Sequence, residues 1–196
     1  SSWKDNCLMP IPLGVLAAAG AGAAGGGNSF DLLETVLIST ATKNVDFTNL
    51  GSLSNYKHLQ IRWVVRSNNN SASDAIILRF NGDINNIYAD HFILGNGSTV
   101  FSSAATTKDN IEVAENIPAN TDTANGFGAG VIDILDFSNT QKNKTTRTLY
   151  GRSTSVNRLA LASGLWASTA AVTSIRLQVL SGSYVAGSRV SLYGIK

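Results

Sequence analysis

Hydrophobic and polar residues alternate with a period of two along much of the chain after residue 33. The clearest example is residues 56–66, and residues 172–180 repeat the alternation. A period of two is typical of a β-strand that buries one face. Both segments therefore predict half-buried strands. The apolar face of the first would consist of Leu59, Ile61, Trp63 and Val65.

Shorter segments of the same character follow one another along the chain, separated by clusters of Asn, Ser and Gly that favour turns. The further strands are predicted at residues 35–39, 44–47, 75–80, 87–92, 131–137, 146–151, 157–162 and 189–193. Long surface loops are predicted at residues 102–110 and 118–130. The chain is therefore expected to be all-β, with a single antiparallel β-sandwich, jelly-roll-like, over residues 34–196.

Residues 1–33 differ from this body, because no charged side chain lies between Asp5 and Asp31 and residues 8–27 are rich in Gly and Ala. A signal peptide and a membrane-spanning helix are two interpretations of such a segment. The glycines disfavour a helix, and the strongly apolar part, residues 8–16, is shorter than the roughly 20 residues that a span needs. Pro10 and Pro12 favour an extended backbone. We therefore predict an extended N-terminal arm that packs against a partner subunit or folds back on its own domain.

The composition excludes several classes of protein. Only 14% of residues are charged and the net charge is +2, whereas a typical soluble domain carries about 25% charged residues. This balance disfavours a nucleic-acid-binding protein. A single cysteine, Cys7, excludes an intramolecular disulfide framework and a cysteine-based zinc site.

Candidate catalytic side chains are few and poorly grouped. His58 lies on the polar face of its predicted strand, and Asp90 next to His91 would point to the opposite face of the sheet. Asp133 and Asp136 are three residues apart, so a regular strand would place them on opposite faces as well. We expect no catalytic residue and no cofactor.

One segment has the side chains of a metal site. Residues 81–86 read NGDINN and are rich in oxygen ligands that calcium prefers. The same residues are common in tight turns, and the EF-hand spacing is absent. We therefore interpret the segment as a turn and expect no metal site.

A series of short motifs resembles a family of tailed-bacteriophage virion structural proteins, including those of cyanophages. The resemblance covers nearly the whole chain, although residues 1–8 extend beyond the expected start of its first motif. The motifs, in chain order, are MPIPLGVLAAAGAG at 9–22, YKHLQIRW at 56–63, RFNGD at 79–83, a strand with Tyr88 and His91, FGAGVIDILDFSN at 127–139, KNKT at 142–145, SGLW at 163–166, AVTSI at 171–175 and SLYGI at 191–195.

This resemblance implies a non-enzymatic structural protein of the virion, assembled in the host cytoplasm. Together with the predicted N-terminal arm, it suggests a capsid-associated decoration protein of the cement or knob kind. The arm would hold this protein on the particle. The expected partners are further copies of the chain, with a trimer favoured, and the major capsid or tail protein. The residues expected to make the assembly contacts are Met9, Pro10, Ile11, Pro12, Leu13, Val15 and Leu16.

Two alternatives remain at this point. The chain could be a tail or tail-fibre protein whose sandwich binds a host surface glycan through its long loops, with Phe101 and Phe127 as the receptor-facing aromatic residues. An enzyme acting on host polysaccharide is the other alternative, and it would have to use His58, His91, Asp133 or Asp136. Neither alternative requires a membrane span.

Overall fold

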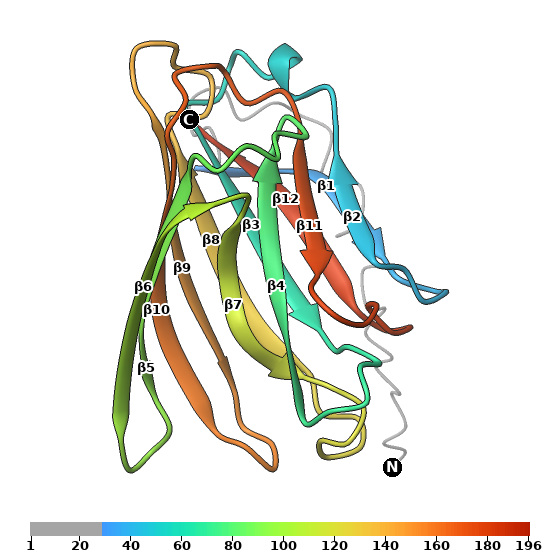
Figure 1. Cartoon of the computed structure of the whole chain (residues 1–196). Coiled ribbons are helices and arrows are strands. Elements are labelled where there is room, and N and C mark those ends of the chain that lie inside the picture. The colour runs from blue at the N-terminus through green and yellow to red at the C-terminus, as the bar shows by residue number, and fades with distance from the viewer. Residues whose placement is uncertain (1–28) are drawn as a thin grey trace, which may run out of the picture.

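The computed structural model describes residues 29–196, and it confirms the prediction of an all-β sandwich (Figure 1). Two antiparallel sheets pack together, and one 3₁₀ turn, η1 (Leu50–Ser52), interrupts the strands. The large sheet has the order β1 (Phe30–Leu37), β12 (Arg189–Ile195), β3 (His58–Val65), β8 (Gly128–Leu135), β9 (Lys144–Arg152), β10 (Arg158–Trp166), β5 (Tyr88–Gly95) and β6 (Val100–Lys108). The small sheet has the order β2 (Asn44–Phe47), β11 (Ile175–Val179), β4 (Ser73–Phe80) and β7 (Ile111–Pro118).

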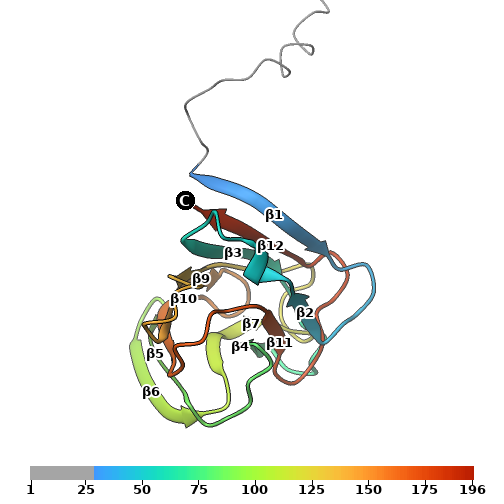
Figure 2. The same ribbon diagram turned by 90° about the horizontal axis from the view of Figure 1, so that it is seen from above.

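Eight of these strands are wound as a jelly roll. In each sheet the strand order follows that fold, with β1-β12-β3-β8 on one side and β2-β11-β4-β7 on the other. The hairpin β5–β6 comes between β4 and β7 in the chain, and the hairpin β9–β10 comes between β8 and β11. Both hairpins join the same edge of the large sheet, which therefore curls past the small sheet (Figure 2).

The core lies between the two sheets, and the alternation in β3 predicts its contribution correctly. Leu59, Ile61, Trp63 and Val65 are all buried. They belong to one continuous apolar cluster with inward side chains of the small sheet, including Ile76, Leu78, Phe80 and Leu177. Burial of these side chains is the main stabilising contribution to the sandwich.

The prediction of a loop at residues 102–110 is wrong, because most of that segment forms β6. Its sequence, VFSSAATTK, lacks an apolar face, and pairing with β5 is what makes it a strand. The sequence pattern also misses the strand β7. Its pairing with β4 shifts at two points, so that Val113 and Ala114 are both buried although they are neighbours in the chain. These irregularities remove the period-two signal.

The first strand of the body begins at Phe30, a few residues before the predicted boundary at 33/34. Residues 30–33 thus belong to the large sheet, where β1 pairs with β12. The rest of the predicted arm lies outside the described residues. This includes every residue expected to make assembly contacts, from Met9 to Leu16.

One position of the large sheet requires glycine, because two aromatic side chains lie close against its backbone. Gly130 on β8 pairs with Trp63 and Tyr150 on the neighbouring strands. A Cβ atom at Gly130 would lie 2.3 Å from Trp63 Cζ2 and 2.9 Å from Tyr150 Cβ. Only glycine leaves room for both aromatic side chains, since real Cβ atoms do not approach so closely.

Candidate interaction surface

A row of apolar side chains crosses the outer face of the large sheet, away from the core. In the register of the sheet Ile93 lies opposite Leu161, Leu161 opposite Leu149, and Leu149 opposite Val131. Residues directly opposite in antiparallel strands share a face and contact each other. Ile93, Leu149 and Leu161 are each about half exposed, at 51–53%. The row therefore continues over four neighbouring strands, β5, β10, β9 and β8.

A second apolar row runs beside the first. Val100 of β6, Leu159 of β10 and Val64 of β3 are 67%, 64% and 38% exposed. Small residues on the strands between them, Gly95, Gly151 and Ala129, complete the row in the sheet register. We call the two rows together the outer apolar band; its members are Val64, Ile93, Val100, Val131, Leu149, Leu159 and Leu161.

Some of the strands that carry this band are apolar on both faces. In β10, for example, Ala160, Ala162 and Trp166 are buried in the core while Leu159 and Leu161 face outward. A strand with apolar residues on both faces is typical of a sheet that is covered on both sides. Isolated exposed apolar residues are ordinary, but a contiguous apolar patch marks a contact surface. The outer apolar band is therefore the strongest candidate for a functional site among the described residues.

A polar row borders the band on one side. His91 and Ser163 lie opposite each other, with 3.2 Å between His91 Nδ1 and Ser163 Oγ. Beside them Arg147 Nη2 donates to Asp133 Oδ2 at 2.8 Å, and Gln60 Nε2 donates to Asp133 Oδ1 at 2.8 Å. Apolar contact area with a polar, hydrogen-bonded rim is the usual anatomy of a protein interface.

Toward β12 the outer face becomes basic. Arg62 on β3 lies over the rings of Phe30 and Tyr193, with 5.1 Å and 4.5 Å from Cζ to the ring centroids. Arg189 on β12 lies opposite Val64 and is exposed. The band thus ends at β3 on this side.

Of the candidate catalytic residues, the structure brings His58 and Asp136 together, whereas His91 and Asp133 have separate partners. His91 lies beside Ser163, a neighbour that sequence reasoning missed because the two are 72 residues apart in the chain. Asp90 points to the other face, as the alternation predicts, and there accepts from Lys108 Nζ at 2.9 Å. Asp133 pairs with Arg147, and no carboxylate of residues 29–196 is hydrogen-bonded to the His91 ring.

The other histidine lies near the end of the same sheet. His58 Nδ1 accepts from the backbone N–H of Asp136 at 2.9 Å. The Asp136 carboxylate pairs with Lys142, and the hydrogen bond from that ammonium group is the main cause that lowers the Asp136 pKa. Asp133 and Asp136 are thus held by different cations and share no site.

Residues 81–86 form a turn, as interpreted from the sequence. Asn81 and Gly82 adopt positive φ, at 54° and 66°. Asp83 accepts from the Asn85 N–H and from Trp166 Nε1, at 2.9 Å each, and the first of these bonds is the main cause of its lowered pKa. Within residues 29–196 no three His, Cys, Asp or Glu side chains gather as a metal site would require.

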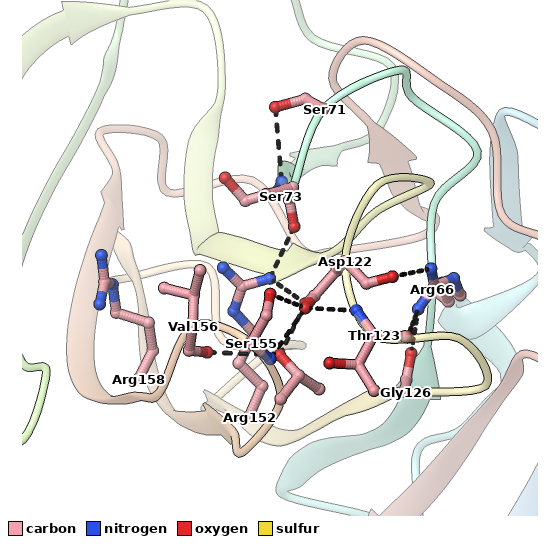
Figure 3. Close-up of polar contacts among 12 residues, drawn as sticks. Arg66, Ser71, Ser73, Asp122, Thr123, Gly126, Arg152, Ser155, Val156 and Arg158 are labelled. Carbon is pink, nitrogen blue, oxygen red and sulfur yellow. Dashed lines mark hydrogen bonds and ion pairs between the residues drawn. The ribbon is translucent and has the colours of Figure 1, made fainter.

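The segment between β7 and β8 is fixed by a buried ion pair rather than left as a free loop (Figure 3). Arg152 Nη1 donates to Asp122 Oδ2 at 2.8 Å, and the two side chains are 1% and 0% exposed. Thr154, Ser155 and the Thr123 N–H also donate to the Asp122 carboxylate. Burial alone would raise the Asp122 pKa, but these hydrogen bonds outweigh it and lower the pKa to about 2.

A second arginine, Arg66, also binds the segment between β7 and β8. Arg66 Nη1 donates to the carbonyl oxygens of Thr123 and Gly126 at 2.7 and 2.8 Å, and Nη2 donates to that of Asp122 at 3.1 Å (Figure 3). Arg66 is buried, so these backbone oxygens take the place of water. The segment therefore has a single well-defined conformation.

Replacing Arg66 by methionine is expected to release this segment while the sandwich stays folded. The four carbonyls of the segment that Arg66 contacts would lose their donor, at a local cost of about 1.5–3 kcal/mol. Hydrogen exchange of the amides in residues 119–127 should then be at least about tenfold faster. Arg176→Met is the control, because that arginine is exposed and pairs only with Asp46. Equal exchange in both variants would contradict the role assigned to Arg66.

The two aromatic residues expected to face a receptor have different surroundings. Phe101 lies on β6 and not in a loop, and its side chain is 48% exposed. Phe127 ends the segment held by Asp122 and Arg66, and it is only partly exposed. The two rings therefore belong to different elements rather than to one loop surface.

Comparison of the chain with protein-family models, with curated proteins and with solved structures gives no match. No helix in residues 29–196 has the length and apolar character to cross a membrane.

Proposed function

We propose that this chain is a non-enzymatic structural protein of a bacteriophage virion, a capsid decoration protein that works by covering the outer face of its large sheet. The partners are further copies of the chain, most simply in a trimer, and the major capsid protein. The proposal goes beyond the fold, and one observation carries it: the outer apolar band crosses neighbouring strands without a charged side chain among its members.

The exposed apolar area of the band agrees with a role in an assembly that is held by more than one contact. Full burial of a Leu or Ile side chain is worth about 1.5–3 kcal/mol, so the half-exposed band could supply on the order of 5 kcal/mol when covered. Association itself costs about 4–15 kcal/mol. The band alone would thus give only weak association, and a stable assembly needs an additional contact.

The shape of the surface supports a fixed protein contact over glycan recognition. A small-ligand site usually has convergent polar groups within a concave pocket. The band is an open sheet face, and the depression at its centre is lined by Val131, Asp133, Arg147, Leu149 and Leu161, of which Asp133 and Arg147 already pair with each other. Phe101 and Phe127 do not form a common aromatic platform. A decoration protein therefore fits these residues better than a tail-fibre receptor module.

The virion assignment rests on the ordered motifs of the sequence. SLYGI falls in β12, YKHLQIRW mainly in β3, and FGAGVIDILDFSN mainly in β8. These are neighbouring strands of the jelly roll. The motifs thus support membership of a structural family, while the outer apolar band supports the mode of action.

The test is a double variant, Leu149→Lys with Leu161→Lys, which places two charges at the centre of the band. Both side chains point to solvent, so the body should remain folded. We expect the unaltered chain to sediment as an oligomer and to be incorporated into phage particles, and the double variant to be a folded monomer that is not incorporated. Thr40→Lys with Thr48→Lys is the matched control, since both threonines are exposed and lie outside the large sheet.

Two results would overturn the proposal. One is a double variant that self-associates and enters particles as well as the unaltered chain. The other is an unaltered chain that remains monomeric at high concentration and never enters particles.

A further inference from the structure

The large sheet ends in an open, unprotected edge at β6. No strand of residues 29–196 lies beyond it, and all its residues are exposed or partly exposed. It contains no proline, and its first charged residue is Lys108 at its end. Over Val100–Ala105 its pairing with β5 is regular, so its outer backbone groups form an even row. Such an edge readily accepts another strand.

The other edges of the described sheets are blunted. β1 carries Asp31 and Glu34 and has an irregular register between Leu32 and Glu34. β2 has only four residues. β7 carries glutamates, has shifted register and ends in Pro118. Among the edges that the structure describes, β6 alone offers six successive residues, Val100–Ala105, with regular pairing and with neither charge nor proline.

We infer that Met9–Leu16 of a second copy of this chain adds to the free edge of β6 as a further strand. This inference rests on the proposed assembly role and supplies the second contact which that role needs. The sequence of the segment, MPIPLGVL, agrees with it. In a strand, alternate residues direct their backbone N–H groups to the same side. Pro10 and Pro12 would therefore remove two successive donors from one side, while Ile11 and Leu13 direct their N–H groups to the other side.

This arrangement would permit one strand addition and prevent the next. The side with Ile11 and Leu13 can pair with β6, and the proline side becomes a protected new edge. Met9, Ile11, Leu13 and Val15 would also place their side chains on one face. Both faces of the sheet offer apolar contact there, because Val100 and Phe101 are neighbours on β6, are exposed and point to opposite faces.

The position of β6 favours a second copy over the chain's own segment. β1 and β6 form opposite edges of the large sheet (Figure 2), and seven interstrand steps of about 4.8 Å amount to roughly 34 Å along it. Residues 17–29 span at most about 43 Å when fully extended. The chain's own segment would need an almost taut linker around a curled sheet. A second copy needs none, and repeated head-to-tail addition gives a closed ring where the rotation between successive copies closes.

The experiment uses the alternation of backbone donors. In the full chain, Leu13→Pro removes a donor on the pairing side, whereas Gly14→Pro removes one on the opposite side. Leu13→Ala controls for the lost side chain. The readout is hydrogen exchange of the β6 amides, residues 100–108, at low and high protein concentration. We expect at least about tenfold slower exchange at high concentration in the unaltered chain and in Gly14→Pro, and loss of this effect in Leu13→Pro.

Cross-linking provides a second measurement that does not depend on the proline variants. Two differently tagged chains, both with Cys7→Ser, carry Ile11→Cys and Ser103→Cys, respectively. Oxidation of the mixture should join the two tags, and Ser103 can be exchanged for Ser102 or Ala104 to test the register.

The inference is overturned if β6 exchange is the same in the unaltered chain and Leu13→Pro, or if its protection is independent of concentration. Failure of the two tags to become joined at any of the three β6 positions would overturn it as well. If the band variant abolishes association while β6 exchange never depends on residues 9–16, the inference fails and the proposed function stands. If the band variant changes nothing, the proposed function fails.

Discussion

Asp122→Ala is expected to lower the free energy of unfolding by about 3–5 kcal/mol, because it leaves the buried charge of Arg152 without its partner. The hydroxyls of Thr154 and Ser155 and the Thr123 N–H lose their acceptor at the same time. Denaturant unfolding at neutral pH measures the loss. Asp46→Ala is the control, since the Asp46–Arg176 pair is exposed and should contribute only about 0–1 kcal/mol.

The same carboxylate predicts part of the acid dependence of stability. Its pKa is about 2 in the folded chain, below the ordinary value of 3.8. The unfolded chain therefore binds the proton more readily, and the stabilisation from Asp122 is complete above pH 3.8 and declines as the pH falls toward 2. The difference in stability between the unaltered chain and Asp122→Ala should shrink over this range. A difference that is constant with pH, or no larger than that of Asp46→Ala, would contradict the role of the ion pair.

Gly130→Ala is expected to cost about 3 kcal/mol, at the upper end for an overpacked core. The new Cβ would lie 2.3 Å from Trp63 Cζ2 and 2.6 Å from Trp63 Cε2. Trp63 is buried between the sheets and packs near Tyr150, with 6.5 Å between ring centroids, so neither side chain can withdraw easily. Thermal or denaturant unfolding measures the cost.

Gly95→Ala is the matched substitution for this prediction. Gly95 is also a strand glycine of the large sheet, but a Cβ atom at this position would have no neighbouring atom within 4 Å. Its effect should remain within about 0.5 kcal/mol. Equal stability of the Gly130 and Gly95 variants would show that β8 can shift away from Trp63.

The fold could be predicted from the sequence where one face of a strand is buried and the other is polar. β3 and β11 satisfy that condition, and the alternation predicts both. β6 escapes prediction because a strand at an exposed edge buries no apolar face of its own. β7 escapes it because its register shifts bring neighbouring residues into the core together. In both strands the pairing partner determines the structure, and a linear sequence does not display that partner.

The outer apolar band is harder to find for a related reason. Leu159 and Leu161 are apolar residues in an apolar strand, so each resembles a core position. Only the register shows that the residues of the band lie side by side on the face away from the small sheet. Strands with apolar residues on both faces, such as residues 158–166, are the available signal. The ion pair between Asp122 and Arg152 gives no such signal, since its members are 30 residues apart.

The hairpins β5–β6 and β9–β10 separate two tasks within one domain. Most of the outer apolar band and the whole free edge lie on these hairpins, whereas the eight jelly-roll strands enclose most of the core. Under the proposed function, the specificity of assembly can therefore diverge through changes in two hairpins without altering the foldable framework. The β5–β6 tip, where Gly97 has φ of 95° and is followed by the exposed Ser98 and Thr99, is the natural place to graft a foreign peptide for display.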